Sequence, residues 1–250
     1  MKLSKSITAG SLALLLGGFG CKPTDEQGIH DYYNVAPAEV HPVKASEKDI
    51  AIIVDTSSSM HDKVDGERKI VTAKRNLNDM IAGIRDYQQK MQNDIKVGLF
   101  YFDDGVVKRS LPIDDFDYSR LSTAVNKLET SGGTPLGYAL AYAERELDKH
   151  GSGQKSIILL TDGENTVGRD PRDVYRVIKS TNVTYNDSPT TLYVIAYDTD
   201  KKNFAKLEQL GANVYEARSA SELTSVLTTI KRDILPEAPI SPGQFPVKKL

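Results

Sequence analysis

The chain has 250 residues, of which 39% are hydrophobic and 26% charged, and its formal net charge at pH 7 is -2. This composition is ordinary for a soluble globular protein and excludes a chain that is disordered or membrane-spanning over most of its length. A charge so close to zero gives no basic surface for nucleic acid, so we expect no nucleic-acid partner. The single cysteine, Cys21, excludes a disulfide bond within the chain.

Residues 1–20 have the pattern of a secretory signal peptide. Two lysines precede an apolar stretch of small residues, Ala9 to Gly20, which is too short to span a bilayer. Cys21 follows directly, and the segment resembles the signal of bacterial lipoproteins, in which the cysteine is lipidated and becomes the mature N-terminus. Gly18 departs from that family, which prefers Leu at this position. The resemblance implies a protein anchored by lipid to a membrane of the cell envelope, on its periplasmic or extracellular face; cleavage elsewhere or an uncleaved anchor are the alternatives.

The segments that flank the central region do not have the pattern of a folded domain. Residues 21–45 contain prolines and acids with little apolar periodicity, which predicts a lipidated N-terminus followed by a flexible tether. Residues 236–250 contain four prolines and predict a loose tail. We therefore expect one domain, at residues 46–235, with no internal repeat.

Within this domain, predicted strands and helices alternate. Apolar runs rich in β-branched residues predict strands, and apolar residues spaced three and four apart predict helices. In chain order, we expect a strand at 50–54, a helix at 68–87, strands at 95–102 and 106–113, helices at 117–129 and 135–150, a strand at 156–160, a helix at 171–180, a strand at 192–196, a helix at 203–210, a strand at 213–216 and a helix at 219–235. Asp103-Asp104-Gly105 is a hairpin turn signal, which makes 106–113 an antiparallel edge strand. The pattern predicts an α/β fold, with a doubly wound, mostly parallel sheet and helices on both faces.

Side chains that carry oxygen atoms come directly after two of these strands, and another lies in a glycine-rich loop. Asp55, Ser57 and Ser59 come directly after the first strand, and Asp162 follows the strand at 156–160. Thr134 lies in a Gly-Gly-Thr-Pro loop, where it is a good N-cap for a helix that starts at Pro135. Ligands bind at the carboxyl edge of open α/β sheets, and hard oxygens that converge there suit Mg²⁺.

These five positions resemble the metal-ion-dependent adhesion site of the von Willebrand factor A domain, whose pattern is Asp-x-Ser-x-Ser, then a distant Thr and a distant Asp. The resemblance covers residues 46–235. It implies that Ser57 and Ser59 bind the ion directly, that Thr134 binds it directly or through water, and that Asp55 and Asp162 bind largely through water. Because the direct ligands are neutral hydroxyls, the charge of the ion is incompletely neutralised. One coordination position stays open to water, and the resemblance implies that an Asp or Glu of a partner protein replaces this water. Mg²⁺ is the expected ion, Mn²⁺ a substitute, and Ca²⁺ less well suited to so tight a loop.

Other interpretations of these residues remain open. Ser57 and Ser59 also suit a helix cap or a turn, Thr134 a cap alone, and Asp162 an ordinary turn. A catalytic triad of Ser59, His61 and Asp55 is rejected because residues two apart in one loop are poorly placed for it. The chain also lacks the glycine-rich phosphate-binding motifs.

The expected function is that of a metal-dependent protein-binding module of the cell envelope, not an enzyme. Two alternatives come from other classes. One is a metal-dependent hydrolase with His61 or Glu164 as its general base. The other is a structural subunit of an envelope complex, in which the ion only stabilises the loop.

Overall fold

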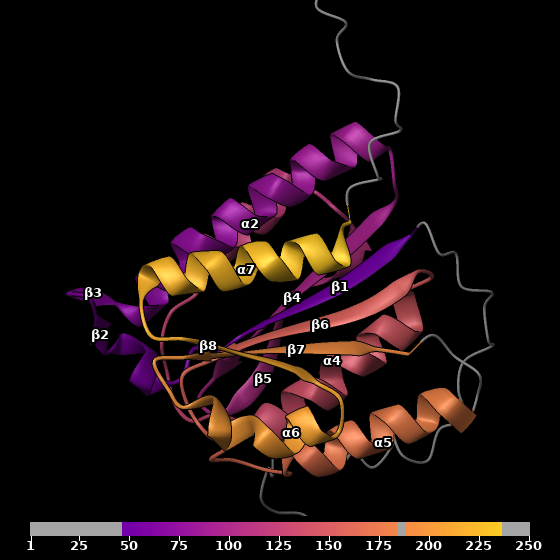
Figure 1. Cartoon of the computed structure of the whole chain (residues 1–250). Helices are drawn as coiled ribbons and strands as arrows, with labels where there is room; N and C mark the ends of the chain where they lie inside the picture. The colour runs from indigo at the N-terminus through magenta and orange to yellow at the C-terminus, as the bar shows by residue number, and fades with distance from the viewer. Residues whose placement is uncertain (1–46, 185–188, 237–250) are drawn as a thin grey trace, which may run out of the picture.

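The computed structural model describes residues 47–184 and 189–236 (Figure 1). The expected signal peptide, Cys21, the tether and all of the tail beyond residue 236 lie outside the described residues. No helix within the two described ranges is both long and apolar enough to cross a membrane.

A six-stranded sheet forms the centre of the molecule, in the order β5-β4-β1-β6-β7-β8. Its strands are β1 (Lys48–Val54), β4 (Ile95–Asp103), β5 (Val106–Asp115), β6 (Gln154–Thr161), β7 (Thr191–Tyr197) and β8 (Asn213–Ala217). All neighbouring strands are parallel except β4 and β5, so β5 is the predicted antiparallel edge strand. In the central register, Val54 pairs with both Tyr101 and Leu160. The parallel strands therefore end at one common edge of the sheet.

Helices cover both faces of this sheet (Figure 1). One face carries α2 (Lys69–Met91), α3 (Tyr118–Asn126) and α7 (Ala220–Ile234); the other carries α4 (Leu136–His150), α5 (Pro171–Thr184), η2 (Lys201–Phe204) and α6 (Ala205–Gln209). Along β1, Ile50, Ile52 and Val54 join the first apolar cluster, whereas Ala51 and Ile53 join the second. Both faces of β1 are buried, which explains why it is apolar at every position from Ile50 to Val54 rather than at alternate ones. The predicted fold class is confirmed.

A small hairpin between β1 and α2 was not expected from the sequence. It consists of β2 (Lys63–Val64) and β3 (Glu67–Arg68), and it follows a short 3₁₀ helix, η1 (Ser58–His61). Asp65 and Gly66 form its turn with φ of 53° and 83°. Two positive φ values in an Asp-Gly pair are typical of a tight hairpin turn. Its strands are only two residues long, so they leave no alternating apolar pattern to detect.

The prediction that Thr134 caps α4 is wrong. The helix begins at Leu136 with Pro135 at the N-cap position, and Asn165 Oδ1 from the loop after β6 accepts the Gly137 N–H in its first turn at 3.3 Å. The backbone of Thr134 is instead bonded to the loop after β6: its N–H donates to the Thr166 hydroxyl at 2.8 Å, and its carbonyl accepts the Thr166 N–H at 2.9 Å. These bonds to a distant segment place Thr134 outside the helix, which local sequence cannot indicate.

Both outer ends of the described chain lie at the amino end of the sheet. The carbonyl of Glu47 accepts the N–H of Gln154 at the start of β6, at 2.9 Å. The carbonyl of Pro236 accepts the Tyr87 hydroxyl, near the end of α2, at 3.5 Å. The start of β1 and the end of α7 are therefore opposite the edge at which the parallel strands end (Figure 1).

Candidate metal site

The loop after β1 is shaped by the side chain of Asp55. This carboxylate is fully buried; its Oδ1 accepts the Ser57 N–H at 2.8 Å, and its Oδ2 accepts the Thr161 hydroxyl at 2.5 Å. The first bond folds the backbone back on the aspartate side chain, as aspartates commonly do in turns. Burial raises the pKa of Asp55, and the hydrogen bonds from Ser57 and Thr161 act in the opposite direction. Asp55 thus fixes the loop after β1 through hydrogen bonds on its buried side.

Oxygens from two strand ends converge above Asp55. The hydroxyl of Ser57 is 3.1 Å from that of Ser59, and the Ser59 hydroxyl donates to Asp162 Oδ1 at 2.7 Å. Asp162 comes from the end of β6, and more than 100 residues separate it from Ser59 in the sequence. The structure therefore brings Asp55, Ser57, Ser59 and Asp162 into one hydrogen-bonded group at the carboxyl edge.

The Thr134 loop approaches this group through its backbone. Ser58 N–H donates to the Gly132 carbonyl at 3.0 Å, and Ser131 N–H donates to the Thr56 carbonyl at 2.6 Å. Gly132 has a φ of 66°, and a Cβ there would lie 2.4 Å from Cα of Asp104, so the close approach of this loop to the β4–β5 turn requires glycine. Thr134 itself is buried, but within the described ranges its hydroxyl makes no hydrogen bond to the other four predicted residues.

Two charged residues of the site were missed from the sequence. The Lys69 ammonium, in the first turn of α2, is 2.9 Å from Asp162 Oδ2 and 2.9 Å from Asp198 Oδ2. Burial disfavours its charge, but the contacts with Asp162 and Asp198 outweigh this effect and raise the pKa of Lys69. A signal was present: a cation is unfavourable at a helix N-terminus, so a lysine there needs a compensating partner. Asp198 directly follows β7, just as Asp162 follows β6.

The donor chemistry fits a small, hard divalent cation. Among the described residues, no three or more His, Cys, Asp and Glu side chains are grouped so that they could hold a metal ion. The converging donors are instead hydroxyl and carboxylate oxygens, which suit Mg²⁺ better than soft ligands would. The hydroxyls of Ser57 and Ser59, 3.1 Å apart, are near enough to bind one ion together.

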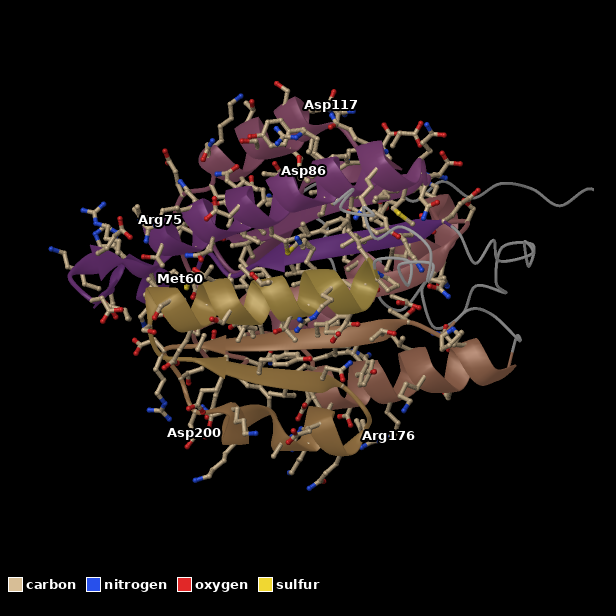
Figure 2. All side chains as sticks on the ribbon, turned by 45° about the horizontal axis from the view of Figure 1, so that its top comes forward. Met60, Arg75, Asp86, Asp117, Arg176 and Asp200 are labelled. Carbon is tan, nitrogen blue, oxygen red and sulfur yellow. The ribbon has the colours of Figure 1, made fainter. Side chains whose placement is uncertain are left out.

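The side chains proposed as alternative general bases lie on the surface. His61 is exposed, and its Nδ1 is 3.4 Å from the Thr130 hydroxyl. Glu164 is also exposed and lines an open groove of about 700 Å³ between the loop after β6 and the η2–α6 segment. In Figure 2, Met60 of η1 and Asp200, just before η2, mark this end of the molecule. Within the described part of the chain, neither side chain is hydrogen-bonded to Ser59 or Asp162.

Known proteins are similar to this chain in sequence and in fold. The Bacillus subtilis (strain 168) protein YwmD is 24% identical over 197 residues, which are 72% of this chain and 83% of YwmD. The structure of proximal thread matrix protein 1 from the mussel byssus, with zinc in its MIDAS motif, superimposes with a TM-score of 0.58 at 21% identity. That match covers 78% of this chain and 48% of the byssus protein, so this chain spans about half of its length.

A second solved structure is similar to this chain, and the match covers nearly the whole of that second structure. The vWF domain of the type V pili tip protein Mfa5 from Porphyromonas gingivalis has a TM-score of 0.57 at 12% identity, over 82% of this chain and 99% of that domain. At these identities the structures show a shared fold. The family model of the von Willebrand factor type A domain matches residues 49–229, which include all five predicted site residues. This chain therefore belongs to the von Willebrand factor type A domain family.

Proposed function

We propose that this domain binds another protein through a divalent cation held at the carboxyl edge of its sheet. Ser57, Ser59 and Thr134 would hold the ion, with Asp55 and Asp162 close by through water. Such an ion retains much of its charge because its direct ligands are neutral hydroxyls. An Asp or Glu of the partner would complete its coordination. Mg²⁺ is our first choice, because Mg²⁺ readily keeps several waters; Mn²⁺, Ca²⁺ and Zn²⁺ are the ions to compare with it.

The observation that carries this proposal is the position of the Ser59 hydroxyl. It lies 3.1 Å from the Ser57 hydroxyl and 2.7 Å from Asp162 Oδ1, so three oxygens from two distant loops meet at one place. Ser59 is exposed, whereas Asp55 beneath it is fully buried. The group is therefore open on one side, where a partner can reach it.

The similar structures support a role in adhesion or matrix assembly. They include a byssus matrix protein with zinc in its MIDAS motif and a pilus tip protein. We extend to this chain the binding of a divalent ion, and we place the protein in the cell envelope with a lipid anchor at Cys21. Because β1 begins at the end of the domain opposite the site, an anchored N-terminus would let the site face away from the membrane (Figure 1).

The first test measures metal binding by isothermal titration calorimetry with Mg²⁺. Ser57→Ala and Ser59→Ala should each weaken or abolish binding because they remove a hydroxyl ligand. Ser58→Ala is the matched control, since Ser58 is exposed and its hydroxyl makes, among the described residues, one weak hydrogen bond, to the Gly132 carbonyl at 3.3 Å. Equal binding by Ser58→Ala and Ser59→Ala would contradict the proposed ligand set.

The second test asks whether the ion mediates partner binding. Envelope proteins should be captured by crosslinking in Mg²⁺ and should not be captured when excess chelator is added before the crosslinker. The captured partner should be missing with Ser59→Ala but present with Ser58→Ala. Capture that survives chelation would exclude an ion bridge. If Ser57→Ala lowers the melting temperature and spares capture, the ion has a structural role in an assembly subunit. Hydrolysis of phosphoesters that requires Mg²⁺ or Mn²⁺ would instead favour the enzyme alternative.

A further inference from the structure

A buried ammonium lies beside the proposed metal site. The Lys69 side chain is 7% exposed and contacts two carboxylates, Asp162 and Asp198, each at 2.9 Å. Asp162 is shared: its Oδ2 accepts from Lys69, while its Oδ1 accepts from Ser59 in the ion-binding group. The same carboxylate thus faces the proposed ion on one side and a fixed positive charge on the other.

Lys69 is unfavourably placed for a helix and is held there by the two acids. It is the first residue of α2, where the positive end of the helix dipole repels a cation. Asp198 lies in the left-handed region with a φ of 56°, which non-glycine residues adopt uncommonly, and its N–H is anchored to the Ala217 carbonyl at 2.8 Å. Strained or unfavourable positions of this kind often mark functional sites. Both residues are placed by elements outside the β1 loop, namely α2 and the end of β7.

The charges of the network balance one divalent ion. Its ionisable groups, connected by the contacts above, are Asp55, Asp162, Asp198 and Lys69. With the three acids ionised and the lysine charged, their sum is -2. Asp55 and Asp162 alone also give -2, so Lys69 and Asp198 add a pair with no net charge. Losing either member of this pair would change the charge that faces the ion by one unit.

We propose that the Lys69–Asp198 pair sets the affinity of the site for its ion. Lys69 weakens ion binding by repulsion and by engaging one oxygen of Asp162, and Asp198 offsets this effect by holding and neutralising Lys69. The inference rests on the proposed function only in requiring that the site binds a divalent cation; it does not depend on the partner. Asp198 is 40% exposed on its side chain, so the offsetting charge is accessible from solvent while the ammonium is not.

The test compares Mg²⁺ affinities of the full mature chain by isothermal titration calorimetry, with circular dichroism to verify folding. Lys69→Met removes the charge but keeps the length of the side chain, and it should tighten Mg²⁺ binding by about tenfold or more, since a unit charge this close to an ion has an effect of that order. Asp198→Asn should weaken binding by about tenfold, because Lys69 is then less compensated. The double variant restores the sum of -2 and should bind within about threefold of the wild type.

A matched control pair lies at the same end of the molecule. The Lys202 ammonium is 3.8 Å from Asp200 Oδ2, and the Lys202 side chain is 85% exposed. Lys202→Met and Asp200→Asn make the same charge changes at a pair whose ammonium is largely exposed, where screening is strong, and should leave Mg²⁺ affinity nearly unchanged. Equal effects in the two pairs would show that only the overall charge matters and would overturn the inference.

The outcomes separate this inference from the proposed function. Unchanged or weaker binding by Lys69→Met would overturn it and make Lys69 a structural residue that orients Asp162. If Lys69→Met does not fold, the Asp198→Asn variant is the test, because the Asp198 side chain is partly exposed and its replacement is expected to preserve the fold. Weaker Mg²⁺ binding by Asp198→Asn would then support the inference, and unchanged binding would refute it. If Lys69→Met binds Mg²⁺ and the wild type does not, the inference is supported. If neither the wild type nor any variant binds Mg²⁺, both proposals are overturned. Loss of partner capture with the expected affinities intact would contradict the proposed function alone.

Discussion

Thr161 donates its hydroxyl to Oδ2 of Asp55 at 2.5 Å, and both residues are fully buried. The bond joins the last residue of β6 to the first residue after β1, beneath the oxygens of the candidate metal site. The same hydroxyl also contacts the backbone of Gly163 at 3.2 Å. Thr161 therefore links the two loops that carry Ser59 and Asp162.

Replacing Thr161 by valine should destabilise the domain. Valine keeps the branched shape of threonine but removes the hydroxyl, so Asp55 Oδ2 loses the hydrogen bond that it accepts from Thr161 in the wild type. A buried acceptor that loses its partner costs about 1–3 kcal/mol. The free energy of unfolding, measured with urea, should fall by that amount. Thr161→Ser is the control because it keeps the hydroxyl, and a loss as large as that of valine would indicate that packing rather than the hydrogen bond is responsible.

Gly132→Ala should disturb the site far more than Gly163→Ala. At Gly132 a Cβ would meet the backbone of Asp104 and Gly105 at 2.4 Å and 2.7 Å, and the φ of 66° already disfavours alanine. At Gly163 a Cβ would meet no heavy atom within 4 Å. We expect Gly132→Ala to lower stability by more than about 1 kcal/mol and to weaken Mg²⁺ binding. Thermal unfolding and calorimetry measure both quantities, and equal results for the two variants would contradict the close approach of the loops.

Added Mg²⁺ should raise the melting temperature of the wild type. A ligand that binds only the folded state stabilises it by about 2.7 kcal/mol at a concentration 100 times its dissociation constant. For a domain of this size, each kcal/mol corresponds to roughly 2–4 °C, so a shift of about 5–10 °C is expected. Differential scanning fluorimetry in Mg²⁺ and in chelator measures it. Ser59→Ala should lose the shift and Ser58→Ala should keep it; a shift that persists in Ser59→Ala would place the ion elsewhere.

Glu144 should make stability depend on pH. This carboxyl in α4 is fully buried, accepts the Thr190 hydroxyl at 2.7 Å, and leaves its Oε2 without a hydrogen-bond partner among the described residues. Burial raises the pKa of Glu144 from 4.5 to about 7. Below the unfolded pKa, Glu144 is neutral in both states and costs nothing. Between about pH 4.5 and about pH 7 Glu144 ionises in the unfolded state but stays protonated in the folded state, so stability is lost as the pH rises to about 7, by at most about 3 kcal/mol.

The variant Glu144→Gln isolates this effect because its side chain is neutral at every pH. Urea unfolding between pH 4.5 and pH 8 should show the wild type losing stability relative to Glu144→Gln as the pH rises. The exposed Glu208 provides the control, and Glu208→Gln should follow the wild type throughout. Parallel curves for wild type and Glu144→Gln would show that Glu144 ionises normally in the folded protein.

The sequence alone determined the fold class and the edge at which the candidate site lies. Apolar runs such as Ile50 to Val54 are long, β-branched and without polar interruption, so they predict buried parallel strands. Once the strands are parallel, residues that follow them must meet at one edge. For this reason Asp55, Ser57, Ser59 and Asp162 could be placed together without coordinates.

Only the tertiary structure decided which charges and backbones meet at that edge. Lys69 reaches Asp162 and Asp198 because the β2–β3 hairpin ends where α2 begins, and because β7 lies beside β6. Thr134 is drawn from its expected capping role by bonds to Thr166, 32 residues away. Local patterns encode the type of each element and the face that it buries. The order of the strands and the start of each helix are decided by packing across the whole domain, so contacts between distant loops have no local signature in the sequence.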